Sequence, residues 1–354
     1  RLFATAIPVH LITGLDYVPC ILLIGVFTLI YTYLGGLKAV VAMDVVQMFI
    51  YLGGAVASMI LILSHLPNGW ADVVRYATKN GADKFQVINP YRGGSLFDFL
   101  TAPYTLAGGL LGGTFLTMAS HGTDQLLVQR LLGCKTRWDS QRALMLDAAF
   151  IVLQFAFFLV LGLCLFAFYA GVPFQQLGLK SSDEIFPKFI VENLPFGVAG
   201  LVVAGVLASA MGTLSSSISS LASSTYLDLF KRTARGRSLS EKQEVVWSRL
   251  FTLLWGILLI GGAMLFRDTR NPVVELGLKI ASFTYGGLLG TFFLGLFFRR
   301  TNQRDAAAGL GAGLGAMILV LSRTRIDFTW HTLIGCAVTI IVGNLASLKH
   351  RRAV

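Results

Sequence analysis

The sequence predicts an all-α protein whose helices cross a membrane several times. Hydrophobic residues make up 55% of the 354 residues and charged residues only 13%, and the mean hydropathy is +0.70. Many apolar runs also reach the length of about 20 residues that a helix needs to span a bilayer. A soluble domain carries more charge than this, so the composition indicates a polytopic membrane protein.

The apolar runs place the helices in order along the chain. We expect a partial helix at 1–14, followed by spans at 17–34, 43–64, 99–120, 141–170, 194–224, 245–266, 273–298, 305–322 and 328–348. The segment 66–97 is expected to lie outside the membrane and to carry a short surface helix. Because the chain begins at Arg1, without an initiator Met and inside a helical pattern, we expect it to be a fragment.

The positive charges predict the orientation of the spans. The formal net charge is +11, but Lys and Arg cluster in short connections, as they do in the cytoplasmic loops of membrane proteins. One set of alternating connections holds seventeen of these residues and the other set ten. We therefore expect 35–43, 129–141, 231–249, 299–305 and the basic tail 349–354 to be cytoplasmic, with the protein in the plasma (inner) membrane and no nucleic-acid partner.

No pattern in the chain indicates an enzyme. The four cysteines are scattered without a C-x-x-C pair, and the five histidines have no metal-ligand spacing. Neither a G-x-S-x-G nor a Walker A segment is present. We therefore expect neither catalysis nor an organic cofactor.

The span 194–224 is unusually rich in hydroxyl side chains towards its end. An unpaired hydroxyl in hydrocarbon costs about 2–7 kcal/mol, so each of these groups needs a partner. One helix face carries five of them at steps of three and four, namely Ser209, Thr213, Ser216, Ser220 and Ser223. Two interpretations are open: a packing face whose serines bond carbonyls one turn back, or a face towards a wet or ion-filled cavity.

Asp44 favours the second interpretation. It is the one carboxylate near the start of the span 43–64, where its alternative role is that of an N-cap. A carboxylate together with several hydroxyls is the set of oxygen ligands that a small hard cation prefers.

Four sequence blocks resemble the sodium:solute symporter family. In the family's order they are Tyr33–Gln47, Gly122–Gln125 with Gln129-Arg130, Ala208–Leu229 and Phe283–Arg300. The resemblance implies an all-α, LeuT-like five-plus-five inverted repeat with sites at mid-membrane, here lacking the first two core helices and most of the third. It implies one transporter domain at 1–348, with a partial first repeat at 1–64, a second repeat at about 99–298 and two additional helices at 305–348.

The resemblance also implies two sodium sites on the hydroxyl-rich helix. The first comprises Ser209, Gly212 and Thr213, and the second joins Asp44 to Ser215 and Ser216. Gly212 departs from the family, which usually has a hydroxyl there, so the first site would have one side-chain ligand fewer. Sodium is the coupling ion that this implies.

Six polar residues are candidate substrate contacts: His121, Asp124, Gln125, Gln154, Lys279 and Ser282. In sugar-carrying relatives the position of Asp124 is a polar gate or a substrate contact, and the alternative here is a bond to nearby backbone. Lys279 either pairs with Glu275 four residues earlier or attracts an anionic solute. Gln154 and Ser282 either line a cavity or bond between helices.

Four glycines precede these residues in the span 99–120, namely Gly108, Gly109, Gly112 and Gly113. Glycine breaks in such a helix are a pointer to an unwound binding segment. Close packing of neighbouring helices against these glycines is the other interpretation.

Together these features predict a sodium-coupled symporter that imports a small polar solute by alternating access. The solute class is left open among sugars, amino acids, monocarboxylates, vitamins and sialic acid. The expected partners are the solute, sodium ions and the lipid bilayer. A membrane sensor module and a non-transporting truncated remnant of such a carrier are the two alternatives.

Overall fold

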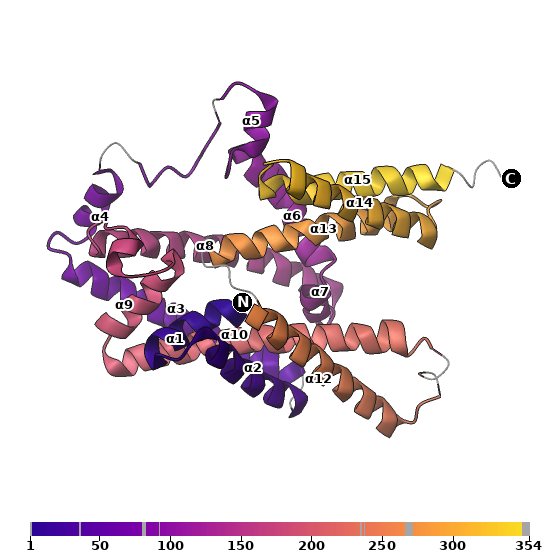
Figure 1. The fold of residues 1–354 in the computed structure, drawn as a ribbon, viewed down its shortest axis with the longest axis horizontal. Helices are drawn as coiled ribbons and strands as arrows, with labels where there is room; N and C mark the ends of the chain where they lie inside the picture. Colours follow the sequence, from indigo (N-terminus) through magenta and orange to yellow (C-terminus); the bar gives the residue numbers. More distant parts are fainter. Residues whose placement is uncertain are drawn as a thin grey trace. The chain divides into compact units, whose positions relative to one another are not determined.

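The computed structural model describes residues 2–34, 37–79, 83–91, 93–233, 236, 238–265 and 272–348, and the side chains of 34 and 37–44 lie outside that description. These residues form helices and connections, without a strand among them (Figure 1). The chain divides into two compact units, the first at 1–85 and 141–273 and the second at 86–140 and 274–354. The predicted tail 349–354 lies outside the described residues.

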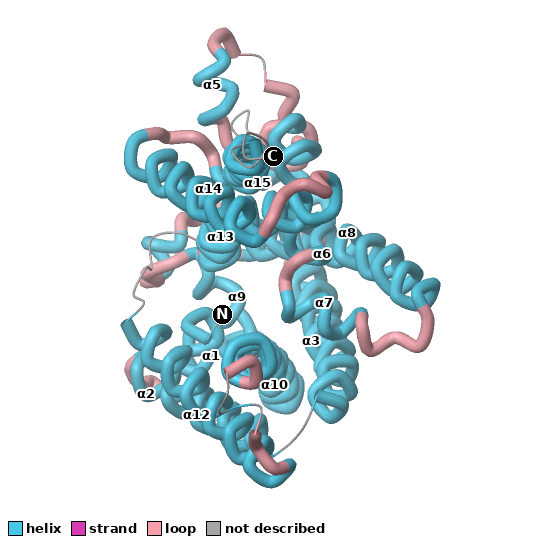
Figure 2. The backbone as a smooth tube through the Cα atoms, turned by 90° about the vertical axis from the view of Figure 1, so that its right-hand side faces the viewer, coloured by secondary structure: helices cyan, strands magenta, loops and turns pink. Residues whose placement is uncertain are grey.

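The first unit is built around α10 (Phe196–Ser224), which starts directly after Pro195. Packed against it are α1 (Leu2–Thr13), α2 (Tyr17–Leu34), α3 (Leu37–His65), α9 (Ile185–Asn193) and α12 (Glu241–Leu265). Figure 2 shows α2 and α12 beside α10. α1 and α2 meet at a bend of 115°, and α10 continues into the π-helix η5 (Thr225–Phe230).

The first unit also contains α4 (Trp70–Ala77), most of α8 (Arg137–Phe168), and the short 3₁₀ helices η3 (Phe174–Leu177) and η4 (Ser182–Glu184). The surface helix predicted within 66–97 is α4. Asp72 stabilises its first turn, because its carboxylate accepts hydrogen bonds from the Asn68 backbone N–H at 2.9 Å and side chain at 3.2 Å, and the backbone bond lowers the pKa of Asp72.

Two apolar clusters hold the first unit together. In one, Ile21 and Ile24 of α2 pack with Leu214 and Ile218 of α10 and with Ile260 of α12. The other cluster joins α3, α4, α8, α9 and α10 through Ile62, Val73, Leu161, Phe189 and Val202. Lipid tails are as apolar as these side chains, so helices in a membrane gain stability from close fit more than from burial itself.

The contact between α3 and α10 shows how close this fit is. A Cβ atom added to Gly54 would lie 2.2 Å from Val202, and one added to Gly205 would lie 2.5 Å from Ile50. The residue numbers of the contacts increase along α10 as they decrease along α3, so the two helices are antiparallel. Glycine therefore lets them approach at two successive turns.

The second unit contains α13 (Val273–Phe297), α14 (Gln303–Arg323) and α15 (His331–Leu348), with η6 (Phe328–Trp330) before α15. α14 and α15 lie side by side (Figure 1). α14 starts with a capping box formed by Asn302 and Asp305. Glycines again allow close approach, since a Cβ on Gly309 would lie 2.6 Å from the Thr339 carbonyl oxygen and one on Gly286 would lie 2.7 Å from that of Thr332.

This unit also contains α5 (Leu96–Thr101), the π-helix η2 (Gly108–Gly112), α6 (Gly113–Gly122) and α7 (Gln125–Leu131). The predicted span 99–120 is therefore not one straight helix. The chain turns at 102–105, where Pro103 follows the end of α5 and Tyr104 has a positive φ of 54°. A proline lacks a backbone N–H and cannot continue the hydrogen-bond ladder.

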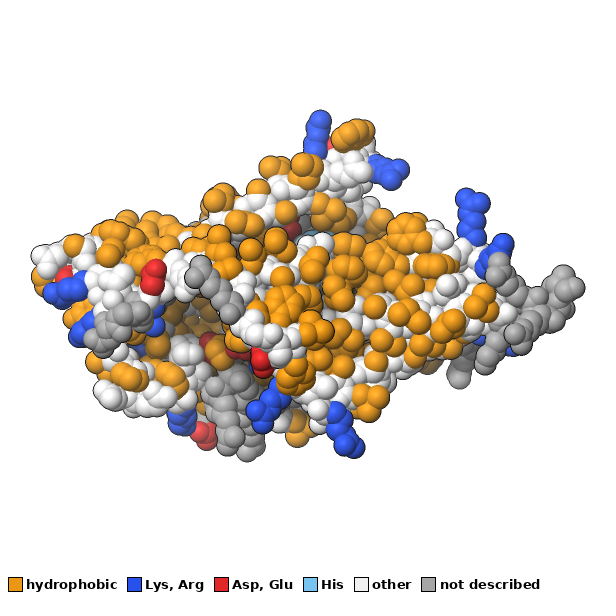
Figure 3. Space-filling model, turned by 90° about the horizontal axis from the view of Figure 1, so that it is seen from above, with side chains coloured by type: hydrophobic (Ala, Val, Ile, Leu, Met, Phe, Trp, Pro, Cys, Tyr) orange, Lys and Arg blue, Asp and Glu red, His pale blue; other side chains and the backbone are white. Residues whose placement is uncertain are grey.

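Seven described helices are long and apolar enough to cross a membrane, and α1 with α2 passes the same test as a bent pair. Large hydrophobic side chains point outward from them, including Phe27, Phe49, Leu153, Ile257 and Phe297, which are between 60% and 70% exposed. Hydrophobic side chains are spread over much of the face shown in Figure 3. Such a surface suits contact with lipid.

Packing explains two of the four glycines predicted to mark a binding segment. A Cβ on Gly112 would lie 1.8 Å from the Thr329 carbonyl oxygen, and one on Gly108 would lie 3.0 Å from Thr329 Oγ1. Gly109 and Gly113 have open space around them. The chain is helical through all four residues, so this segment is a widened helical turn rather than an unwound one.

Gly112→Ala is expected to destabilise the protein, whereas Gly113→Ala is not. The added methyl group of the first variant overlaps backbone that cannot rotate away, and overpacking of this kind costs about 1–3 kcal/mol. The apparent melting temperature of the two purified variants in detergent tests this. Equal melting temperatures would contradict the contact between η2 and η6.

Candidate functional site

The hydroxyl-rich face of α10 lies inside the first unit. Ser215, Ser216 and Ser220 are 0%, 3% and 8% exposed, and Gly212 is buried, while Ser209 and Thr213 are half-buried. These groups therefore face protein and not lipid. Both interpretations of the face, as a packing surface and as a cation site, require this.

Hydrogen bonds within α10 use the protons of two of these hydroxyls. Thr213 Oγ1 donates to the Ser209 carbonyl at 3.1 Å, and Ser217 Oγ donates to the Thr213 carbonyl at 3.0 Å. A hydroxyl that donates its proton keeps two lone pairs. The back-bonded geometry thus leaves the Thr213 oxygen able to ligate a cation, so the two interpretations are compatible at this residue.

α2 contributes two further hydroxyls to this region. Tyr31 donates to the Met211 carbonyl oxygen at 2.6 Å, and Thr32 Oγ1 lies 2.8 Å from Ser215 Oγ. The face of α10 that carries the predicted cation ligands is thus bonded to a second helix. The side chain of Asp44, the remaining ligand of the predicted second site, lies outside the described residues.

Gln47 is a further candidate residue that was not among the predicted site residues. Its side chain is 6% exposed, and its Oε1 has no hydrogen-bond partner among the described residues. Gln47, Ile50 and Gly54 lie on one face of α3, and the latter two residues touch α10. The feature that could have identified Gln47 from the sequence is its position, as an amide in an apolar run three residues after Asp44.

Three of the predicted substrate residues, His121, Asp124 and Gln125, lie at the break between α6 and α7 in the second unit. Asp124 caps α7, since Leu126 N donates to Oδ1 at 2.9 Å. Its other oxygen accepts a hydrogen bond of 2.5 Å from the Tyr285 hydroxyl of α13. His121 Nδ1 is 2.8 Å from Ser120 Oγ, and Gln125 is exposed. Asp124 therefore bonds nearby backbone, as the alternative interpretation predicts, and it also links the start of α7 to α13.

The other candidate substrate contacts have partners within or between helices. Lys279 Nζ and Glu275 Oε1 form the predicted ion pair at 2.9 Å, and the buried Ser282 donates to the Lys279 carbonyl at 2.9 Å. In the first unit, Gln154 Nε2 donates to the Tyr51 hydroxyl at 3.2 Å, which joins α8 to α3. Lys279 thus forms the predicted ion pair and Gln154 bonds between helices, whereas the bond of Ser282 lies within its own helix.

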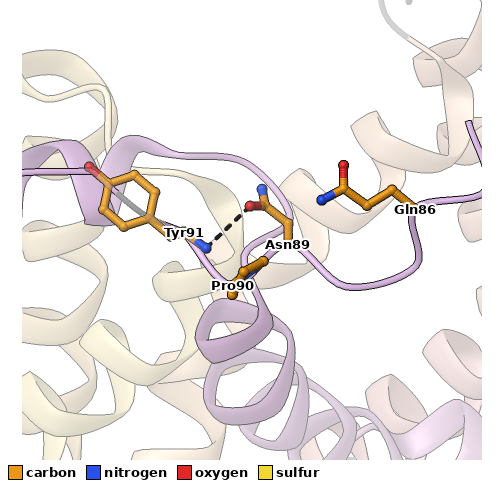
Figure 4. A pocket seen from close by; sticks show the side chains of 4 residues that line it. All are labelled: Gln86, Asn89, Pro90 and Tyr91. Atoms are coloured by element: carbon orange, nitrogen blue, oxygen red, sulfur yellow. Dashed lines mark hydrogen bonds between the residues drawn. The ribbon is translucent and has the colours of Figure 1, made fainter. Parts of the chain in front are cut away.

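Two other features of the described residues add no candidate site. No group of three or more His, Cys, Asp or Glu side chains that could hold a metal ion occurs among the described residues. A surface hollow of about 410 Å³ is lined by Gln86, Asn89, Pro90 and Tyr91 (Figure 4). Tyr91 N donates to Asn89 Oδ1 at 3.3 Å there. The hollow contains none of the predicted site residues.

Comparisons with known proteins agree on one group of transporters. A family model described as "Sodium:solute symporter family" matches residues 1–313. The chain is 26% identical over 328 residues to a sodium/sialic acid symporter of Aliivibrio fischeri, a match covering 92% of this chain and 63% of that protein. It is 30% identical over 329 residues to the human sodium/iodide cotransporter, covering 90% and 48%. The chain thus spans about half to two thirds of these relatives.

A solved structure is similar over nearly the whole chain. It is described as the substrate-bound outward-open state of a Na⁺-coupled sialic acid symporter, with a TM-score of 0.80 and 25% identity. The match covers 98% of this chain and 70% of that one. The helices found here therefore have counterparts in a protein that crosses a membrane.

Asp124→Ala is expected to loosen α7, while Tyr285→Phe is expected to leave it intact. The first variant removes the N-cap, which costs about 0.5–2 kcal/mol, and the second removes only the bond to the other oxygen. Hydrogen–deuterium exchange of the amides at 126–128 measures this difference. The same fast exchange in both variants would show that α13, rather than the cap, holds the start of α7.

Proposed function

Since the chain belongs to the sodium:solute symporter family, we propose that it forms part of a carrier that couples inward sodium movement to solute import. The predicted resemblance and the LeuT-like, all-α fold are confirmed, and the chain is part of an integral membrane protein. We place it in the plasma membrane with the C-terminus in the cytoplasm, on the distribution of Lys and Arg. Transport, without catalysis, is the activity proposed.

One observation carries this proposal: oxygen atoms of buried and half-buried residues lie together over two turns of α10. Ser209, Gly212 and Thr213 form the first proposed sodium site, and Ser215 and Ser216 contribute to the second. Sodium is a hard cation and binds oxygen ligands. Burial of these oxygens supports the proposal because a cation that has lost its water needs ligands from protein.

The antiparallel contact of α3 with α10 supports the assignment of Asp44 to the second site. Both helices rise by about 1.5 Å per residue, so the pairing of Gly54 with Val202 and of Ile50 with Gly205 can be extended in equal steps. The extension brings the backbone at 44 to the level of about 211–212, within one turn of Ser215. We propose that the Asp44 carboxylate completes the second site.

The same extension brings Gln47 to the level of about 208–209. Its Oε1 is buried without a partner among the described residues, and an unpaired buried acceptor costs about 1–3 kcal/mol. A sodium ion near Ser209 would remove that cost. We propose that Gln47 adds an oxygen to the first site, where Gly212 provides no hydroxyl.

The energetics of coupling follow from charge and site occupancy. Moving one positive charge inward releases about 2.3 kcal/mol per 100 mV of membrane potential. Occupied sodium sites transmit this energy only if they favour the state that binds solute from outside over the alternative state. α10 is well placed for this role, because it contacts α3, α12 and the bent pair of α1 and α2.

The solute class is proposed from the relatives. Those named above carry sialic acid and iodide, and a mouse relative at 31% identity is a sodium-coupled monocarboxylate transporter. These solutes are anions. Lys279 gives little independent support, because Glu275 already neutralises it. Uptake of radiolabelled sialic acid, iodide, a monocarboxylate and a neutral sugar into proteoliposomes, with and without sodium, tests the class, and sodium-dependent uptake of the sugar alone would overturn it.

Thr213→Ala and Asp44→Ala are expected to weaken the sodium dependence of uptake. Loss of a ligand should raise the half-saturating sodium concentration by roughly tenfold or more, equivalent to about 1.4 kcal/mol of binding free energy. Ser224→Ala, at the far end of α10, is the matched control and should behave as the wild type. Unchanged sodium activation in both Thr213→Ala and Asp44→Ala would overturn the site assignment.

The variant Gln47→Leu tests whether Gln47 binds sodium or only packs, through its melting temperature and its half-saturating sodium concentration. Leucine has a similar volume and removes the unpaired oxygen, so the melting temperature without sodium should rise, because the desolvation cost of about 1–3 kcal/mol is removed. If Gln47 binds sodium, the half-saturating sodium concentration should rise in the same variant. A more stable protein with unaltered sodium affinity would exclude Gln47 from the site.

A further inference from the structure

Two neighbouring residues of α2 touch the face of α10 that carries the proposed ligands. The Tyr31 hydroxyl bonds the Met211 carbonyl oxygen at 2.6 Å, and Thr32 Oγ1 lies 2.8 Å from Ser215 Oγ. Met211 and Ser215 are four residues apart and lie on one face of the helix. α2 therefore holds this face at two successive turns, although neither Tyr31 nor Thr32 is a proposed ligand.

The Tyr31 contact lies beside the weakest part of the first site. Met211 directly precedes Gly212, which has no side chain to fix its own turn or to reach a cation. A backbone carbonyl has two lone pairs, and helix formation uses one of them. The phenol takes up the remaining capacity of the Met211 carbonyl and thereby fixes the turn that carries Gly212 and Thr213.

The Thr32 contact determines where the proton of Ser215 lies. Thr32 Oγ1 is 2.6 Å from the Thr28 carbonyl and 2.8 Å from Ser215 Oγ, and its single proton can serve only one of them. When that proton lies on the shorter bond to Thr28, Thr32 accepts the proton of Ser215. The lone pairs of Ser215 then point away from Thr32 and are free to bind a cation.

We propose that Tyr31 and Thr32 are positioning residues for the two sodium sites, Tyr31 for the turn at Gly212 and Thr32 for the Ser215 hydroxyl. The inference rests on the proposed function, because it concerns the sodium affinity of those sites. Neither hydroxyl touches the ion. Both act through α10, as the hydrogen-bonding partners of metal ligands do in other proteins.

The test is direct binding of radioactive sodium ions to the purified, complete protein, which needs no knowledge of the solute. Tyr31→Phe and Thr32→Val each remove one hydroxyl and keep the shape of the side chain. Each is expected to raise the half-saturating sodium concentration roughly twofold to tenfold, the effect of losing one hydrogen bond. Thr32→Ser keeps the hydroxyl and should restore wild-type binding.

α2 offers a matched control for each variant. Tyr33→Phe removes a nearby phenol of α2, whose ring lies under the Arg249 guanidinium at 5.2 Å. Thr28→Val removes a buried hydroxyl one turn earlier that donates to the Ile24 carbonyl at 2.7 Å. Both controls should bind sodium as the wild type does. Melting temperatures in sodium-free buffer show whether a variant is merely less stable.

The outcomes separate this inference from the proposed function. Thr213→Ala serves as the reference, and unaltered sodium binding in that variant would overturn the proposed site itself. If Thr213→Ala weakens binding while Tyr31→Phe and Thr32→Val bind sodium like their controls, the site stands and the positioning role is overturned. A Thr32→Ser variant that binds as weakly as Thr32→Val also overturns the role of Thr32. If the half-saturating sodium concentration rises in only one of Tyr31→Phe and Thr32→Val, the positioning role is supported for that residue and excluded for the other.

Discussion

A hydroxyl or amide buried away from water must find a hydrogen-bond partner or another ligand, and this requirement shapes α10 and the helices around it. Ser215 and Ser216 are nearly inaccessible, so the face of α10 that carries them cannot point towards lipid. α1, α2, α3 and α12 surround it, and α2 supplies hydroxyls as well as apolar packing. The same polar groups that require this face of α10 to be covered by protein are those that can replace the water of a cation.

Close approach of backbones is the second condition of this fold. Membrane helices gain little from burying apolar groups away from lipid, so they rely on small residues at their contacts. Gly54 and Gly205 serve the pair α3 and α10, and Gly286 and Gly309 serve the helices of the second unit. At Gly112 the same need accounts for a residue that resembled part of a binding segment in the sequence.

Much of the fold was predictable because apolar length alone identifies a membrane helix. The expected span at 194–224 is observed as Phe196–Ser224, and that at 273–298 as Val273–Phe297. The span at 99–120 was wrong in detail, since hydropathy does not register a turn inside an apolar run, although Pro103 marked it. The domain boundaries and repeats stay predictions, as do the sodium and substrate residues.

The sequence could not foresee which polar groups would meet. Nothing in the spacing relates Tyr31 to Met211 or Asp124 to Tyr285, because such pairs depend on how distant helices pack. Gln47 was overlooked for a related reason. One amide in an apolar run is unremarkable until its burial and its unpaired oxygen are known. By contrast, the i,i+4 pair of Glu275 and Lys279 was predictable, since a single helix determines it.

The link between Asp124 and Tyr285 bears on how the protein is assembled during synthesis. The two residues are 161 positions apart, so a ribosome produces the break between α6 and α7 long before it produces α13. Until the later helix arrives, one carboxylate oxygen can cap α7 while the other still relies on water. The break between α6 and α7 therefore gains its last hydrogen bond only after α13 has been translated.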